Sequence, residues 1–247
     1  MTAVNRMLIF AVMLLGFGSS HGSGQSSSEL FQRGREAYRA ADFVTAAKAF
    51  RECVVQHPGA GALQNLGLAE WQSGHVGEAV LAWERACWLD PANRAVKLNL
   101  EFARKNAQLA SSELAWYEVP STWLSANSWA WIASLALWFT VGIIIVPGVF
   151  RKRRTTWQQA LATAGLVVFL ISVPAQVGVW TRSRTGFVTG KGVALRLTPT
   201  LDAETLTQLA PGEPVRWVRA RGNYLFVRTS RSAGWLEKKE LGLICPR

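Results

Sequence analysis

Four landmarks in the first hundred residues recur at a spacing of 33 residues, and this repeat limits what the chain can fold into. The paired landmarks are Gly34 and Gly67, Ala46 and Ala79, Phe50 and Trp83, and Pro58 and Pro91. Such a unit is typical of two helices that cross closely at a glycine, with a proline ending the second helix because proline cannot continue the backbone hydrogen bonds. The repeat therefore predicts pairs of antiparallel helices stacked side by side.

The second unit, "LQNLGLAEWQSGHVGEAVLAWERACWLDP", resembles the tetratricopeptide repeat. Its residues at signature positions are Leu66, Gly67, Gly74, Ala79, Trp83, Ala86 and Pro91. The first unit has Arg33 where an apolar residue is usual and Ala41 where the glycine between the helices would stand. The segment "NRAVKLNLEFARKNAQL" repeats the register of a first helix, and we expect it to cap the array. The resemblance implies an all-α tetratricopeptide repeat domain over residues 27–110.

In arrays of this kind, the first helix of each unit contributes to a concave face that binds an extended or helical peptide. The helical register places Phe31 and Leu98 on this face together with ten residues that we predict to bind a protein partner. The ten are Arg35, Tyr38, Arg39, Gln64, Asn65, Leu68, Trp71, Asn99, Phe102 and Lys105. Tyr38 and Trp71 are expected to form an exposed aromatic pair, the usual composition of a binding hot spot. The alternative is that both rings pack against the cap helix near Phe102. Family members that grip a free carboxylate use lysine and asparagine, and only Asn65 fits that pattern.

Two long segments without charge, residues 129–150 and 159–180, follow a linker over residues 111–128. At about 1.5 Å per helical residue, each is long enough to cross roughly 30 Å of hydrocarbon. Tryptophans lie near the ends of both segments, where indole rings prefer the headgroup layer. We therefore predict a transmembrane hairpin in contact with the lipid bilayer.

The short loop between these segments, residues 151–158, determines the predicted orientation. It begins with Arg151, Lys152, Arg153 and Arg154, and lysine and arginine are retained on the cytoplasmic side. Residues 1–22 have the order of a basic start, an apolar stretch and small residues that is typical of a signal peptide. Both observations predict a two-pass membrane protein with both soluble domains on the outer, periplasmic side.

The C-terminal part, residues 186–247, contains five short segments with strand character separated by turn residues. Its order, including "VALR", "APGEP" and "GWLE", resembles bacterial SH3-like domains, which implies a small all-β barrel. Trp217, Tyr224 and Trp235 have two readings: residues that fill the barrel core, or residues that line a peptide or glycan groove.

No pattern in the chain indicates an enzyme, a cofactor or a metal site. The histidines, His21, His57 and His75, are scattered, and Cys53, Cys87 and Cys245 have no close spacing. Cys53 and Cys87 are expected to be buried thiols, although the predicted compartment would permit a disulfide. The formal net charge is +11, but the predicted orientation places the basic C-terminal domain outside the cytoplasm, which argues against nucleic acid as a partner.

The complete order of segments, together with "VPSTWLSANSWAWIASLALWF" and "NLEFARKN", resembles the E-type (BatE) proteins of aerotolerance operons. The resemblance implies a non-catalytic assembly protein of the inner membrane. Its implied partners are membrane-anchored von Willebrand factor A proteins and, indirectly, a MoxR-type ATPase. An alternative remains open: a cell-wall module whose SH3-like barrel recognises peptidoglycan and whose repeats hold it near a wall enzyme.

Overall fold

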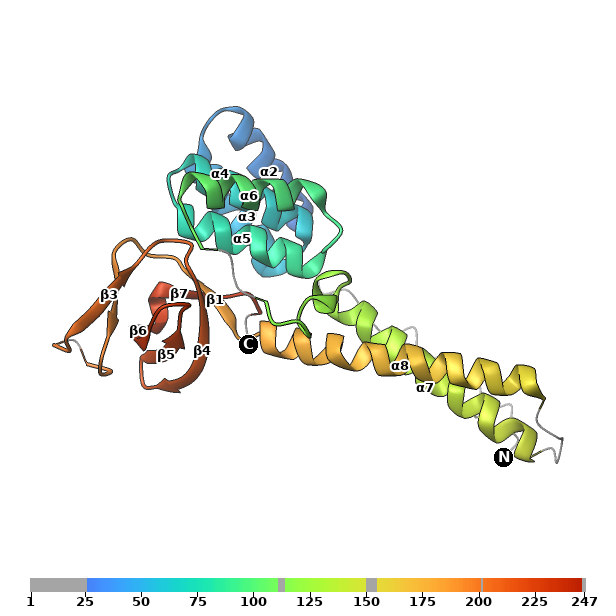
Figure 1. Ribbon diagram of the computed structural model, residues 1–247. Coiled ribbons are helices and arrows are strands. Elements are labelled where there is room, and N and C mark those ends of the chain that lie inside the picture. Colours follow the sequence, from blue (N-terminus) through green and yellow to red (C-terminus); the bar gives the residue numbers. More distant parts are fainter. Residues whose placement is uncertain (1–25, 111–113, 150–154, 201, 246–247) are drawn as a thin grey trace, which may run out of the picture.

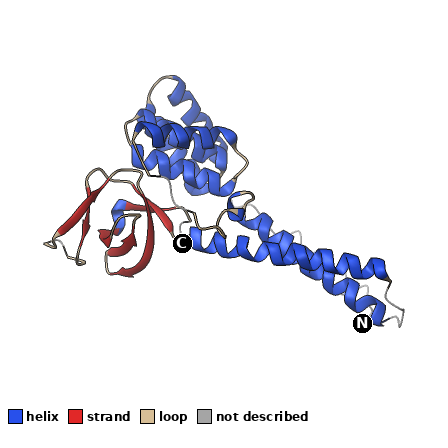
Figure 2. Ribbon diagram, viewed as in Figure 1, coloured by secondary structure: helices blue, strands red, loops and turns tan. Residues whose placement is uncertain are grey.

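The computed structural model describes residues 26–110, 114–149, 155–200 and 202–245. Within these ranges the protein has a bundle of five helices, a pair of long apolar helices, and a domain built on one antiparallel sheet (Figure 1). Figure 2 shows that the strands are confined to the last of these parts. The predicted signal peptide, residues 1–22, and the basic residues Arg151 to Arg154 lie outside the described residues.

The helical bundle follows the predicted repeat. Its helices are α2 (Ser27–Arg39), α3 (Phe43–Gln56), α4 (Ala60–Gln72), α5 (Val76–Leu89) and α6 (Arg94–Asn106). The side chains of Ser26, Asp42 and Asn93 accept hydrogen bonds from backbone N–H groups in the first turns of α2, α3 and α6. Pro58 and Pro91 follow the ends of α3 and α5, as the sequence predicts.

The two helix pairs, α2 with α3 and α4 with α5, pack closely at the repeated glycines. A Cβ atom added at Gly34 would lie 2.7 Å from the ring of Phe50. A Cβ at Gly67 would overlap the indole of Trp83 in the same way. Both aromatic side chains are almost completely buried. The two pairs therefore use the same crossing contact.

The turn inside each pair also repeats. Ala41 has a φ of 58° and Gly74 has a φ of 78°, so both residues are in the left-handed region. Glycine adopts this conformation freely, whereas for a residue with a side chain it costs roughly 1 kcal/mol of conformational free energy. The first pair thus forms the turn without the glycine that the repeat pattern prefers.

The apolar segments form α7 (Ala126–Val149) and α8 (Thr156–Arg182), both long and apolar enough to cross a membrane. The helices pack against each other through small residues. Gly165 of α8 lies against the hydroxyl of Thr140, and that hydroxyl donates a hydrogen bond to the Ala136 carbonyl at 2.8 Å. Pro174 lies inside α8 without ending it.

The β-domain contains a seven-stranded antiparallel sheet with the order β3-β2-β6-β5-β4-β1-β7. Its strands are β1 (Thr185–Val188), β2 (Val193–Arg196), β3 (Thr205–Leu209), β4 (Pro214–Arg221), β5 (Tyr224–Arg228), β6 (Ala233–Glu237) and β7 (Leu241–Leu243). Two short 3₁₀ turns, η1 (Pro120–Thr122) and η2 (Lys238–Glu240), lie before α7 and before β7.

The five predicted strands are present as β2 to β6, but the expected number was wrong because β1 and β7 were missed. All four residues of β1 are buried, so the alternation of apolar and polar residues that marks a strand is absent. Strand β7 has only three residues and runs directly into apolar Ile244. So short a strand shows no alternation of apolar and polar residues that could identify it.

The β-domain packs directly on α5. Phe187 of β1 and Ile244 belong to the same buried cluster as Trp83 of the bundle. Arg85 of α5 donates hydrogen bonds from Nε and Nη2 to the Leu243 carbonyl, at 2.9 and 2.8 Å. The bundle and the β-domain consequently share one core, and both lie at the same end of the α7/α8 pair (Figure 1).

Candidate functional site

The ten predicted partner-binding residues lie on α2, α4 and α6, the first helix of each pair and the last helix of the bundle. Arg39, Phe102 and Lys105 are exposed. The remaining seven are half-buried: Arg35, Tyr38, Gln64, Asn65, Leu68, Trp71 and Asn99. We refer to these ten residues, together with Arg94 and Leu98, as the α2/α4/α6 face.

Aromatic and aliphatic side chains form a stripe across this face. The ring centroid of Trp71 lies 5.9 Å from that of Trp83 and 5.6 Å from that of Phe102. Trp71 is therefore half-buried between the core and α6, as in the alternative in which its ring packs near Phe102, and the expectation of an exposed ring was wrong. Leu98 and Phe102, one turn apart on α6, are each 54% exposed, so the accessible apolar surface lies there.

Tyr38 also has a packing role. Its ring meets Phe43 edge to face, with centroids 5.3 Å apart, and it packs against the buried cluster around Phe50. Trp71 belongs to a different cluster. Tyr38 and Trp71 consequently do not form the exposed aromatic pair that the helical register predicted.

The amide side chains of this face are partly used inside the bundle. Asn65 donates from Nδ2 to the Gly61 carbonyl at 2.9 Å. The Gln64 side-chain oxygen accepts a hydrogen bond from Asn93 Nδ2 at 3.1 Å, which ties α4 to the start of α6. These contacts orient the face but leave it with fewer free donors than the sequence alone suggests.

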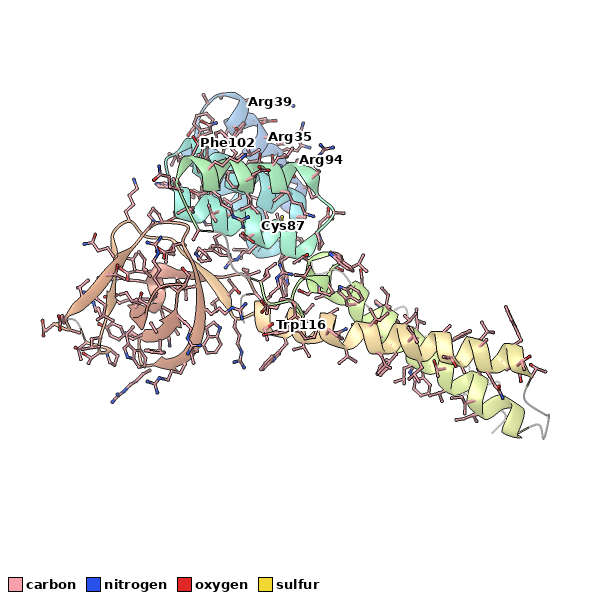
Figure 3. The ribbon with its side chains drawn as sticks, viewed as in Figure 1. Arg35, Arg39, Cys87, Arg94, Phe102 and Trp116 are labelled. Carbon is pink, nitrogen blue, oxygen red and sulfur yellow. The ribbon has the colours of Figure 1, made fainter. Side chains whose placement is uncertain are left out.

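Basic residues also lie on the α2/α4/α6 face. Figure 3 shows Arg35, Arg39, Arg94 and Phe102 on the side of the bundle that is away from the long helices. Arg39 and Arg94 are exposed and, among the described residues, make no hydrogen bond or ion pair, whereas Lys105 is paired with Glu101 at 2.8 Å. Sequence reasoning missed Arg94, although its place one turn before Leu98 on α6 could have identified it.

Charged groups also join the three parts of the molecule near the end of α8. Arg182 donates from Nη1 to the carbonyl and hydroxyl oxygens of Ser121, at 3.1 Å each, and its guanidinium lies 5.3 Å from the Trp88 ring centroid. The buried carboxylate of Glu84 accepts a hydrogen bond from Arg104 at 2.5 Å. Burial raises the pKa of Glu84, and the charges of Arg104 and Arg182 oppose this shift.

A cavity of about 290 Å³ lies at this junction and is lined in part by Glu84, Arg182, Thr185 and Arg216. Several of its charged groups already have partners inside the protein, since Glu84 pairs with Arg104, Arg216 pairs with Glu118 and Arg182 binds Ser121. We therefore assign the cavity no ligand.

The aromatic residues of the β-domain serve mainly as core. Trp235 is buried, and Trp217 packs against the central cluster of the sheet. The guanidinium of Arg219 lies 5.0 Å from the Phe226 ring centroid and 5.3 Å from that of Trp235, and so covers both rings. These positions favour the core interpretation of Trp217 and Trp235 over a groove lined by them.

The cysteines Cys53, Cys87 and Cys245 are free thiols, and Cys53 is buried. Burial raises the pKa of Cys87 to about 11. Among the described residues, no group of three or more histidine, cysteine, aspartate or glutamate side chains has an arrangement that could hold a metal ion.

No family model matches this chain, and no curated protein is similar to it.

Proposed function

We propose that this protein is a non-catalytic scaffold of the bacterial inner membrane, with tetratricopeptide repeats and an SH3-like barrel on the periplasmic side. In this proposal α7 and α8 span the bilayer, and the α2/α4/α6 face binds a protein segment. The length and composition of α7 and α8 support the membrane anchor. The position of the bundle and the β-domain at one end of this pair supports a common compartment for both (Figure 1).

The proposed binding role rests on one observation: exposed Leu98 and Phe102 lie on α6 together with Arg94, whose side chain has no partner within the described residues. Arg39, on α2, is a second exposed arginine of the α2/α4/α6 face. Exposed apolar side chains on a rigid helix can bury surface against a partner, and aromatic residues contribute most to such contacts. The unpaired guanidiniums of Arg39 and Arg94 would attract carboxylates. The ligand of the face is therefore a protein segment that carries both apolar and acidic residues.

The resemblance to BatE-type proteins supplies the identity of the proposed partners. They are membrane-anchored von Willebrand factor A proteins, which would link the scaffold indirectly to a cytoplasmic MoxR-type ATPase. The alternative, a peptidoglycan-binding module, needs accessible aromatic rings on the β-domain. The burial of Trp235 and the packing of Trp217 give that alternative less support.

Site-specific photocrosslinking in living cells tests this proposal. A benzophenone amino acid replaces Phe102 or Leu98 in the full chain, and Val55 serves as the control because it is highly exposed but lies on α3, a second helix. We expect a discrete protein adduct from positions 98 and 102 and none from position 55. Equal adducts at all three positions, or none at 98 and 102, would overturn the binding site.

Charge reversal adds a second criterion. Arg39→Glu combined with Arg94→Glu should reduce the adduct from position 102 severalfold, because the proposed ligand is acidic. Lys48→Glu, an exposed change on α3, should leave the adduct unchanged. An adduct from position 102 that mass spectrometry identifies as a cell-wall enzyme would favour the cell-wall alternative.

A further inference from the structure

The segment between the helical bundle and α7 exposes an unusual number of large apolar side chains. Trp116 is 79% exposed and Trp123 is 63% exposed. Their neighbours in this short stretch that are also exposed are Leu114, Val119 and Leu124. Exposed apolar groups this dense are rare on a protein surface in water and mark a contact with a partner or a lipid.

The same segment buries two of its polar side chains. Glu118 is fully buried and Ser121 is almost fully buried, while the apolar residues beside them point outward. The Ser121 hydroxyl donates to the Glu118 carbonyl at 2.5 Å. This arrangement, polar inside and apolar outside, is the reverse of the pattern in a water-soluble loop.

The segment is held firmly on the end of α8. Gly178 approaches the backbone of Tyr117 and Glu118 so closely that a Cβ there would lie 2.7 Å from the Tyr117 carbonyl oxygen. Arg182 fixes Ser121 by two hydrogen bonds of 3.1 Å. Figure 3 shows Trp116 at the end of the α7/α8 pair that is nearest to the bundle and the β-domain.

Another exposed tryptophan lies at the same end of α8 as this segment. Trp180, in the last turn of α8, is exposed, and the guanidinium of Arg184 lies 4.1 Å from its ring centroid. The Nε atom of Arg184 is buried and has no hydrogen-bond partner among the described residues. An indole with a guanidinium above it suits the boundary between acyl chains and phosphates.

We propose that residues 114–124 together with Trp180 form an interfacial collar that binds the phospholipid headgroup layer. The argument for lipid as the occupant is continuity, because the collar directly adjoins the two apolar helices. Tryptophan is enriched at this depth because its ring is apolar and its N–H is polar. The inference rests on the proposed insertion of α7 and α8, but it is independent of what the α2/α4/α6 face binds.

The collar has a mechanical consequence. Glu118, at its centre, is ion-paired with Arg216 of β4 at 2.6 Å. Because one side of the collar contacts lipid and the other side is fixed to the β-domain, the tilt and height of the β-domain above the bilayer are set. The bundle follows, since it shares a core with the β-domain.

Nitroxide accessibility in proteoliposomes tests the collar. The full chain, with its three cysteines replaced by serine or alanine, carries a single label at Trp116→Cys or Trp123→Cys in vesicles of phosphatidylethanolamine and phosphatidylglycerol. Val55→Cys is the water-exposed control and Ile171→Cys, exposed on α8, is the membrane control. Circular dichroism first establishes that each labelled variant is folded.

We expect labels at positions 116, 123 and 171 to collide more often with oxygen than with a water-soluble nickel chelate, and the label at position 55 to show the opposite. Suppose that labels at 116 and 123 collide mainly with the nickel chelate, as the label at 55 does, while the label at 171 collides mainly with oxygen. That result would overturn the collar and leave the membrane anchor intact. A water-accessible label at position 171 would overturn both the anchor and the collar.

Discussion

Arg216 of β4 donates from a single Nη2 atom to both carboxylate oxygens of Glu118, at 2.8 and 2.6 Å, although 98 residues separate them in the chain. Glu118 is fully buried, so this ion pair joins the β-domain to the segment before α7. Burial alone would raise the pKa of Glu118. Hydrogen bonds from Thr181, from the Ala115 N–H and from Arg216 outweigh burial and hold that pKa below its usual range.

Acid should therefore weaken this junction. Since the folded-state pKa of Glu118 is lower than the unfolded one, the pair stabilises the fold above the usual glutamate pKa of about 4.3, and this stabilisation is lost as the pH falls through the folded-state value. We expect amide exchange in β4 and η1, corrected for intrinsic rates, to increase below about pH 4. In the Glu118→Gln variant, the amides of β4 and η1 should exchange faster already at pH 7. If their exchange in this variant kept the pH profile of the parent protein, Glu118 would not be the group responsible.

Docking of the β-domain on α5 requires a glycine at position 77. A Cβ there would lie 2.5 Å from the Thr189 carbonyl oxygen and 2.6 Å from that of Val188. We expect Gly77→Ala to cost about 1–3 kcal/mol of unfolding free energy, because backbone atoms must move apart. Gly61→Ala is the matched control, since no heavy atom lies within 4 Å of its Cβ. Thermal unfolding that shows equal losses for both variants would argue against the packing explanation.

The left-handed turn at Ala41 offers a stabilising substitution. Ala41→Gly should raise the unfolding free energy by about 1 kcal/mol, because glycine has no steric penalty at a positive φ. Ala40→Gly, at a φ of −79°, should lower it instead. Chemical denaturation of the two variants measures the difference, and an Ala41→Gly variant less stable than the parent would show that the turn is not strained.

Cys87 should react slowly with alkylating reagents. Because burial raises the pKa of its thiol to about 11, little thiolate exists near neutral pH. At pH 8 we expect alkylation by iodoacetamide to be slower in the folded protein than in urea by on the order of a hundredfold, given an ordinary thiol pKa of about 8.5. Mass spectrometry of the peptide that contains Cys87 measures both rates. Similar rates in the two states would refute this prediction.

The proposed topology predicts where reporters are active. A reporter that works only in the periplasm should be active when fused after Leu109 and also when fused after residue 247. Replacing Arg151, Lys152, Arg153 and Arg154 by neutral residues should weaken the orientation, since basic residues determine it. Activity at only one of the two fusion points would eliminate the two-pass arrangement.

The parts of the fold that could be predicted are those whose signals are local. Gly34 and Phe50 meet within one helix pair, and the same spacing recurs at Gly67 and Trp83, so the pattern is visible in the chain. Strand β1 could not be predicted, because burial of all its residues removes the alternation that marks a strand. The helical register placed the ten predicted residues on α2, α4 and α6, but it could not decide whether Trp71 is exposed or packs near Phe102, because that contact depends on how α6 lies against α4.

By itself, the sequence determined the helix pairs, the two apolar helices and most strands, because periodicity, prolines and apolar length act over short distances along the chain. Only the tertiary structure decided which surfaces remain accessible. The pairing of Glu118 with Arg216 and of Arg85 with Leu243 joins residues far apart in the chain. Such contacts depend on how complete domains pack, and no local pattern encodes them. The same packing half-buries Trp71 and leaves Phe102 and Trp116 exposed.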